Sequence, residues 1–381
     1  MGDPRATEPV VFLETDDATR ELDPGIALCL SGGGYRAMLF HVGSLWRLYE
    51  LGLLGQVKRI SSVSGGSITA AMLGLRWQQL SFEPGKIGQD FVPQVVAPIR
   101  ALAGRTLDAS SIIEGVLLPG TISDKIASAY AKYLYGRATL QDLPDAPRFV
   151  INATNIQSGA LWRFEKPYMR DYRVGRVPNP QVSLAVAVAA SSAFPPVLSP
   201  AILELDPASF DPGSGTDLQR EPFTSRVVLS DGGVYDNLGL ETAWKRFATI
   251  LVSDGGGKLA PEEEPKEDWA RHAVRVLDVV DNQVRSLRKR QLIDSFKTRV
   301  RTGTYWGIRT NIADYDLADA LPAPFDKSLA LAKVPTRLKR LDDEVQERLI
   351  NWGYAVCDAA VRKHVQPGSQ PAFPYPEAGL G

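Results

Sequence analysis

The chain has few of the residues that stabilise small secreted domains or bind metals. It contains 2 cysteines among 381 residues, which is too few for a disulfide framework, and it has no Cys-x-x-Cys pair of the kind that binds zinc. It contains only 3 histidines, at positions 41, 272 and 364. Any reaction that needs a histidine base must use one of them. We expect neither a metal ion nor an organic cofactor.

Long hydrophobic runs and an excess of one charge are also missing. Residues 1–27 have neither the basic nor the apolar region of a secretory signal. The most apolar stretch, residues 182–198, is interrupted by serines and by two prolines, whereas a bilayer-spanning helix needs about 20 apolar residues. With 43 basic and 44 acidic residues the formal net charge is −1, which argues against nucleic-acid binding. We expect a cytoplasmic protein that contacts a membrane at most from its surface.

The apolar pattern near the N-terminus predicts two strand–turn–helix units in succession. Residues 26–30 form a short, uniformly apolar run, typical of a buried parallel strand, and residues 35–54 have the apolar spacing of an amphipathic helix. Residues 57–63 and 67–75 repeat the pattern. Such repetition favours an α/β fold with a parallel-rich central sheet sandwiched between helices.

The remaining elements extend this fold. Further strands are predicted over residues 148–154, 160–164, 227–229, 249–252 and 304–309, and helices over most of 83–142 and over 182–190, 269–301 and 336–364. We find no internal repeat and no low-complexity linker. The expected organisation is a polar leader (1–24), one α/β domain (25–366) whose part after residue 257 is mostly helical, and a disordered tail (367–381).

Ser64 lies in the turn between a predicted strand and a predicted helix, where α/β hydrolases place a nucleophilic serine. The tight turn raises the serine Oγ above the sheet, and Gly65 and Gly66 let strand and helix approach closely. Ser62 replaces the first glycine of the usual G-x-S-x-G motif, and serine is small enough to fit there. A serine that only caps the helix is the alternative interpretation.

Three glycines, Gly32, Gly33 and Gly34, lie between the first predicted strand and its helix. Backbone N–H groups in such a loop can stabilise the oxyanion that forms when serine attacks an ester carbonyl, and the helix dipole adds positive potential. Phosphate binding is the alternative use of a glycine loop. The spacings typical of P-loops and of dinucleotide-binding loops are absent.

The candidate general base is an aspartate or a late histidine. His272 and His364 lie in polar surroundings and are expected at the surface, whereas His41 is expected to pack beneath the glycine loop. Asp231 and Asp254 each lie just past a predicted strand and precede two glycines, at the sheet edge where α/β folds bind ligands. A partly desolvated aspartate is basic enough to act on a polarised serine. Local sequence does not distinguish the two aspartates.

Taken together, these blocks resemble the patatin-like phospholipases and, more distantly, the catalytic domain of cytosolic phospholipase A2. The resemblance rests on S-G-G-G-Y-R at residues 31–36, V-S-G-G-S at 63–67, D-G-G at 231–233, and A-S-S-A-F-P-P at 190–196, which is similar to a small-residue and proline block of patatins. It covers residues 26–242 and fades beyond residue 257.

The resemblance implies a serine esterase that hydrolyses phospholipids or other lipid esters through a Ser-Asp dyad and an acyl-enzyme. Ser64 would be the nucleophile, Asp231 rather than Asp254 the general base, and the three glycines the oxyanion hole. No histidine is needed. Two alternatives stay open: a lysophospholipase or general lipid esterase with the same dyad, and a non-catalytic regulatory protein that binds lipids or anions.

Two basic features bear on lipid contact. The resemblance associates Arg36 with the lipid phosphate, and a guanidinium suits phosphate geometry; an ion pair that locks the glycine loop is the alternative. Positive charge also concentrates in the helix predicted over residues 269–301, a pattern typical of docking on anionic lipid or of a solvated helix face. Its basic residues are Arg285, Arg288, Lys289, Arg290, Lys297, Arg299 and Arg301.

Overall fold

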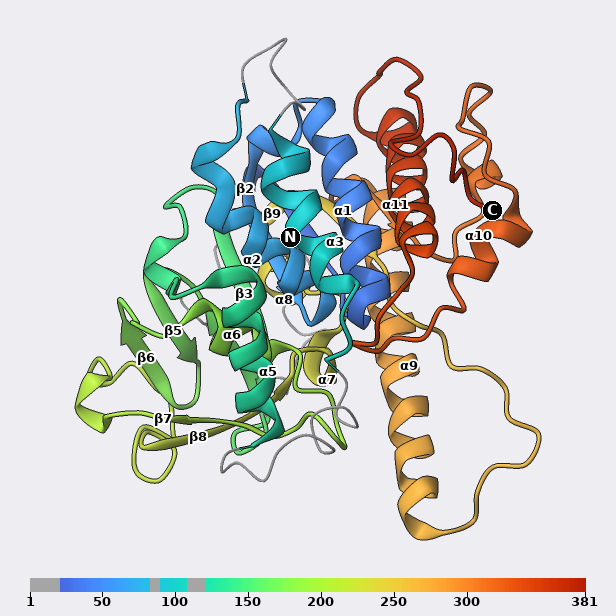
Figure 1. Cartoon of the computed structure of the whole chain (residues 1–381). Coiled ribbons are helices and arrows are strands. Elements are labelled where there is room, and N and C mark those ends of the chain that lie inside the picture. The colour runs from blue at the N-terminus through green and yellow to red at the C-terminus, as the bar shows by residue number, and fades with distance from the viewer. Residues whose placement is uncertain (1–20, 83–89, 108–120) are drawn as a thin grey trace.

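The computed structural model describes residues 21–82, 90–107 and 121–381. Most of the expected leader and parts of the helical region predicted over 83–142 lie outside these residues. Within them the chain forms a ten-stranded sheet with helices on both sides (Figure 1). This arrangement confirms the predicted α/β class and the sandwiched sheet.

One half of the sheet is parallel and the other half is antiparallel. The strand order is β10-β9-β1-β2-β3-β4-β5-β6, and β8 links β7 to β3. All pairs from β10 to β3 are parallel, and the pairs beyond β3 are antiparallel. The strands are β1 (Asp23–Leu30), β2 (Val57–Val63), β3 (Arg148–Asn155), β4 (Ala160–Phe164), β5 (Tyr168–Asp171), β6 (Gly175–Pro178), β7 (Ala201–Glu204), β8 (Arg226–Asp231), β9 (Phe247–Asp254) and β10 (Thr302–Gly307).

The described helices differ widely in length. The longest are α1 (Gly34–Glu50), α2 (Gly65–Arg76), α9 (Trp269–Lys297) and α11 (Asp343–His364). Shorter ones are α3 (Ala97–Ala103), α5 (Ile122–Tyr130), α6 (Leu184–Ser191), α7 (Gly233–Asp236), α8 (Glu241–Trp244) and α10 (Phe325–Leu331). None of these helices is long and apolar enough to cross a bilayer.

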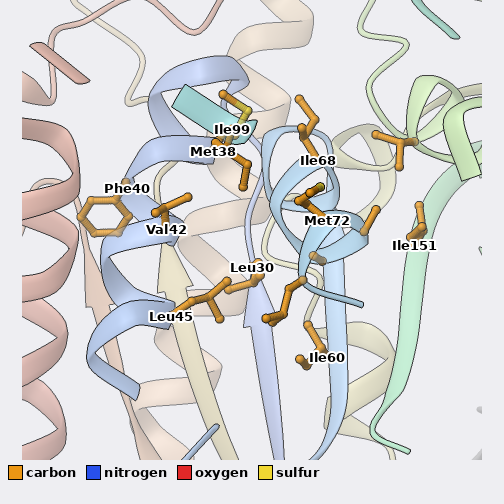
Figure 2. Close-up of a cluster of buried hydrophobic side chains, with 14 of the residues drawn as sticks. Leu30, Met38, Phe40, Val42, Leu45, Ile60, Ile68, Met72, Ile99 and Ile151 are labelled. Atoms are coloured by element: carbon orange, nitrogen blue, oxygen red, sulfur yellow. The ribbon is translucent and has the colours of Figure 1, made fainter. Parts of the chain in front are cut away.

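Alternating side chains of β1 enter two separate hydrophobic clusters, because successive residues of a strand point to opposite faces. Leu28 and Leu30 join the large cluster under α1, α2 and α11, whereas Ala27 and Cys29 join a smaller one under α8 and the end of α9. Figure 2 shows part of the large cluster, in which Leu30 of β1 lies beside Leu45 of α1. Apolar burial on both faces explains the uniformly apolar strand sequence.

Helix α11 packs against α1 at two facing glycines. A Cβ atom on Gly43 would overlap the carbonyl oxygen of Ile350, and one on Gly353 would overlap that of Phe40. Only glycine allows the two helix backbones to approach this closely. This contact fixes α11 beside α1, which begins at the glycine loop.

Strands β2 and β8 meet end to end along one edge of β3. β2 pairs with β3 as far as Val63, opposite Asn152, and β8 continues along β3 with Asp231 opposite Ala153. β4 occupies the other edge of β3. The residue that follows β2 and the last residue of β8 therefore arrive at the same place from opposite directions.

The C-terminal residues correct one expectation. The sequence predicted a disordered tail over 367–381, but these residues pack against the body. The Asn351 side chain donates hydrogen bonds to the carbonyls of Tyr375 (2.7 Å) and Gly379 (2.8 Å). The Tyr375 ring meets Trp46 edge-on, and Leu380 is buried. The local sequence of the tail did not reveal this packing, because its partners Trp46 and Asn351 lie elsewhere in the chain.

Candidate active site

Ser64 lies between β2 and α2 in a backbone conformation that side chains rarely adopt, with φ 50° and ψ −118°. Its N–H donates to the Oγ of Ser191 (3.0 Å). The Ser191 Oγ in turn donates to the Asn152 carbonyl (2.6 Å) and bonds to Ser67 Oγ (2.8 Å). Strained backbone persists only where the surroundings hold it, so these bonds fix the turn. Sequence reasoning did not identify Ser191 in this role.

Ser62, which replaces the first glycine of the nucleophile motif, fits without disturbing the turn. Its hydroxyl donates to the Val150 carbonyl of β3 (3.2 Å) and accepts from Ser67 (3.1 Å). The side chain is therefore used inside the sheet, away from the nucleophile. This explains how the motif tolerates serine at that position.

The glycine loop packs directly against this turn. Gly33 (φ 143°) and Gly34 (φ 58°) adopt conformations that favour glycine, and a Cβ atom on Gly34 would lie 2.9 Å from the backbone of Arg337. The Gly32 N–H already donates to the Asn237 carbonyl (3.0 Å). Among the described residues, no acceptor binds the N–H groups of Gly33 and Gly34. Two of the three expected oxyanion donors are thus free, and the expectation for the Gly32 N–H is corrected.

Asp231 ends β8 and is almost fully buried, with 1% of its surface exposed, beside a Ser64 that is 9% exposed. Its Oδ1 accepts the Gly233 N–H (2.6 Å). Its Oδ2 has no partner of strict hydrogen-bond geometry among the described residues. Burial raises the pKa of Asp231 to about 7, while hydrogen bonding from Gly233 and from the Ser64 hydroxyl lowers it and the charge of Asp281 raises it. The Asp231 carboxyl group, which faces Ser64, is therefore about half ionised at pH 7.

Asp254, the rival aspartate, has a different environment. Its Oδ2 accepts from Tyr305 (2.7 Å) and lies 3.1 Å from Lys289, and its Oδ1 accepts from the Gly256 N–H (2.9 Å). Although burial acts to raise the pKa of Asp254, the charges of Lys289 and Arg285 outweigh it and hold the pKa well below its usual value. The carboxylate of Asp254 is fully engaged and remains ionised.

The histidines lie where the sequence placed them. His41 is buried under the glycine loop, where its ring nitrogens bond to the Ser31 carbonyl (2.9 Å) and the Ser253 hydroxyl (2.8 Å). Burial lowers its pKa to about 4, so it is neutral at pH 7. His272 and His364 are exposed. None of the three lines the cleft at Ser64.

Ser64, Asp231 and the glycine loop line one cleft of about 780 Å³, within the roughly 300–1,000 Å³ typical of small-molecule sites. Its apolar lining includes Phe194, Val197, Leu198, Leu259 and Leu338. Its charged lining, which sequence reasoning did not identify, consists of Lys258, Asp278, Asp281, Arg285 and Arg337. The cleft can therefore accommodate an apolar chain together with a polar group.

Arg36 lies outside the cleft lining and is buried. Its guanidinium donates to the carbonyls of Gly255 (3.0 Å from Nη2), Ala332 (2.9 Å) and Val334 (2.8 Å). Desolvation lowers its pKa to about 10, so it keeps its charge at pH 7. Of the two expectations for Arg36, the structure favours loop support over phosphate contact, with backbone carbonyls in place of the expected ion-pair partner.

The basic helix also differs from expectation, because several of its cations face the body. Arg285 and Lys289 flank Asp254 (3.7 and 3.1 Å). Arg288 lies 3.0 Å from Glu241, and Arg301 bonds to the Trp244 carbonyl (2.7 Å). These four side chains are held by groups of the protein, whereas the other three predicted basic residues, Arg290, Lys297 and Arg299, are exposed.

The family model for patatin-like phospholipases matches residues 28–244, more than half of the chain. The chain belongs to the patatin-like phospholipase family. The matched span contains the glycine loop, Ser64 and Asp231. Beyond the matched residues the chain adds strands β9 and β10 and helices α9, α10 and α11.

Solved structures similar to this patatin-like phospholipase chain include human GIVD cytosolic phospholipase A2, at 13% identity and a TM-score of 0.49, with 94% of this chain and 63% of that chain covered. The same human protein in complex with methyl gamma-linolenyl fluorophosphonate matches at 15% identity and a TM-score of 0.49, with coverage of 91% and 59%. VipD from Legionella pneumophila matches at 14% identity and a TM-score of 0.29, with coverage of 88% and 84%. No curated protein sequence matches the chain.

Proposed function

We propose that the protein is a lipid acyl hydrolase of phospholipase A type that cleaves carboxylic esters with Ser64 as nucleophile and Asp231 as general base. The observation that carries this proposal is the end-to-end meeting of β2 and β8. It brings a strained serine and a buried aspartate of raised pKa to one cleft beside free N–H groups.

In the first half-reaction the Ser64 Oγ attacks the ester carbonyl while Asp231 accepts its proton. The carbonyl oxygen becomes an oxyanion, which the N–H groups of Gly33 and Gly34 stabilise; one such donor contributes about 3 kcal/mol in measured cases. Collapse of the tetrahedral intermediate breaks the ester C–O bond, and the alcohol leaves with the proton from Asp231. Water then attacks the acyl-enzyme with Asp231 again as base, which releases the fatty acid.

The raised pKa of Asp231 suits this role. An aspartate with the ordinary value of 3.8 would be a weak base for a serine hydroxyl, and burial brings the value to about 7. A base works best when its pKa lies near the working pH. Asp254 lacks this property because its paired carboxylate has a lowered pKa.

A covalent serine probe tests the proposal. We expect a fluorophosphonate to label the wild-type protein at Ser64 and to leave Ser64→Ala unlabelled. Ser192→Ala is the matched control, because Ser192 lines the same cleft but its hydroxyl is bonded to the Val188 carbonyl; this variant should retain labelling. Full labelling of Ser64→Ala would refute the assignment of the nucleophile.

Product analysis then separates the substrate classes. The wild-type protein is to be compared on diacyl phospholipid, lysophospholipid and a neutral glyceride, with fatty-acid release as the readout. We expect the diacyl phospholipid to be cleaved, and a preference for either of the others would assign a lysophospholipase or a general lipid esterase. Vesicle binding without fatty-acid release, unchanged by Asp231→Asn, would instead show a non-catalytic binding protein.

A further inference from the structure

The N-terminal half of α9 presents apolar side chains to solvent. Figure 1 shows this helix extending beyond the rest of the fold. In α9 only Leu292 and Ser295, close to its C-terminal end, are buried. Its exposed large apolar residues are Trp269, Val274, Val276, Leu277, Val279, Val280 and Leu287. At 3.6 residues per turn all of these positions except Val274 fall within about half of the helix circumference.

The polar side of the same helix faces the cleft. Asp278, Asp281 and Arg285 line it, and Arg285 also donates to the Gly257 carbonyl. Arg275 bonds to the Ala260 carbonyl (2.7 Å). A helix that packs on a core normally turns its apolar side inward. The N-terminal half of α9 instead turns its polar side inward and its apolar side outward. Within the part of the chain that the structure describes, this polar side makes the hydrogen bonds that tie the N-terminal half of α9 to the body.

Apolar side chains are also exposed where the cleft opens at the end of α6. Phe194 and Val197 line the cleft and are 51% and 46% exposed. Across the α9 surface, Trp269 is 85% exposed at the start of the helix and Leu277 is 63% exposed. Exposed apolar patches of this kind mark sites of protein or membrane contact, and tryptophan favours the membrane–water interface.

We infer that the apolar side of α9 (Trp269, Val276, Leu277, Val279, Val280 and Leu287), together with Phe194 and Val197, docks on the surface of a zwitterionic lipid bilayer. The inference rests on the proposed function, because a lipid hydrolase must receive its substrate from a lipid phase. A second protein bound to both the apolar side of α9 and the patch at Phe194 and Val197 would obstruct the cleft. A bilayer bound at the same place would instead supply substrate to the cleft. The apolar arc is also wider than the a/d seam by which two helices pair.

The charge of this region points to zwitterionic rather than anionic lipid. Residues 258–284 contain seven acidic and four basic side chains, and the acidic residues 262–264, 267 and 268 directly precede or cap the helix tip. Anionic headgroups would be repelled there. Docking therefore depends on apolar insertion and only weakly on salt.

The test measures vesicle binding separately from turnover. Full-length Ser64→Ala protein, which cannot hydrolyse the lipid, is co-sedimented with phosphatidylcholine vesicles with and without phosphatidylserine. The double variant Leu277→Asp/Val280→Asp is made in the same background. Val300→Asp is the matched control, because Val300 is 61% exposed in the turn before β10, away from the cleft lining.

We expect the parent to bind phosphatidylcholine vesicles, the double variant to bind on the order of a hundredfold more weakly, and the control to bind as the parent does. Both exposed positions tolerate aspartate without loss of core packing, and circular dichroism checks that the variants are folded. Binding that is equal in the double variant, or that requires phosphatidylserine and disappears in high salt, overturns the inference. A parent dimer in light scattering that the double variant abolishes also overturns it, in favour of a second copy.

Hydrolysis of a soluble monomeric ester by the Ser64 protein keeps the two proposals distinct. The double variant should hydrolyse this ester at the wild-type rate but lose activity on vesicles. If the wild-type protein hydrolyses the ester but does not bind vesicles, docking fails and the proposed function stands. If it binds vesicles but hydrolyses no ester, the proposed function fails.

Discussion

Replacing Asp231 by asparagine should increase the stability of the fold, and more so at high pH. The folded protein holds this carboxyl group at a pKa of about 7, against an ordinary value of 3.8. Between these two values the folded state keeps a proton that the unfolded chain releases, so stability falls as pH rises. Above pH 7 the folded state must accommodate a buried carboxylate.

The magnitude follows from the same shift. From pH 5 to pH 8 the difference in bound protons integrates to just under two pH units, which at about 1.36 kcal/mol each gives a loss of about 3 kcal/mol in the free energy of unfolding. Asparagine carries no charge, can still accept the Gly233 N–H, and places an amide where Oδ2 now lacks a partner. The gain from Asp231→Asn should therefore be about 3 kcal/mol larger at pH 8 than at pH 5.

Urea denaturation at the two pH values measures this difference. Asp254→Asn is the contrasting variant, because the pKa of Asp254 is lowered by its cationic partners. The stability that Asp254 contributes is present above its unfolded pKa, so its asparagine variant should be less stable than the wild type at pH 8. If Asp231→Asn changes stability equally at pH 5 and pH 8, the pKa of Asp231 is not raised and the argument for this residue as a tuned base is refuted.

Three further outcomes are expected. The rate of hydrolysis of a soluble ester should fall about tenfold from pH 8 to pH 6, since a base of pKa about 7 is then mostly protonated; an acid limb near pH 4 would contradict this. Gly34→Ala should abolish activity because its φ of 58° and the Arg337 backbone exclude a Cβ atom, whereas Gly52→Ala, with a φ of 68° and open space around it, should stay active. Arg36→Lys should lower the melting temperature, with the loss of hydrogen bonds to three carbonyls costing about 1–3 kcal/mol; a KM raised for phospholipids but unchanged for phosphorus-free esters would instead indicate phosphate contact.

Much of the site follows from local sequence. A uniformly apolar run is typical of a strand buried on both faces. Glycine and serine directly after such a run favour a tight turn into a helix. The strand–turn–helix units around Gly34 and Ser64 were therefore predictable. The short antiparallel strands β5, β6 and β7 were not predicted. They span only four residues each, too few for an alternating pattern to be recognised.

Choices between similar residues depended on the tertiary structure. Asp231 and Asp254 have the same local sequence, yet β8 runs antiparallel to β3 and brings Asp231 to Ser64, while β9 places Asp254 beside Lys289. A pKa depends on burial and on charges from distant parts of the chain, which motifs do not encode.

The strand–turn–helix units, the order of the glycine loop, serine and aspartate, and through them the family, could be recognised from the amino-acid sequence alone. These features reside in a few consecutive residues, whose backbone geometry follows from side-chain size and apolar spacing. Three features emerged from the three-dimensional arrangement: the Gly32 N–H is already bonded, Arg36 supports the loop, and Arg285, Arg288 and Lys289 of α9 face the body while most apolar residues in its N-terminal half face solvent. Each of these depends on contacts between residues far apart in the chain, and such contacts leave no local pattern in the sequence.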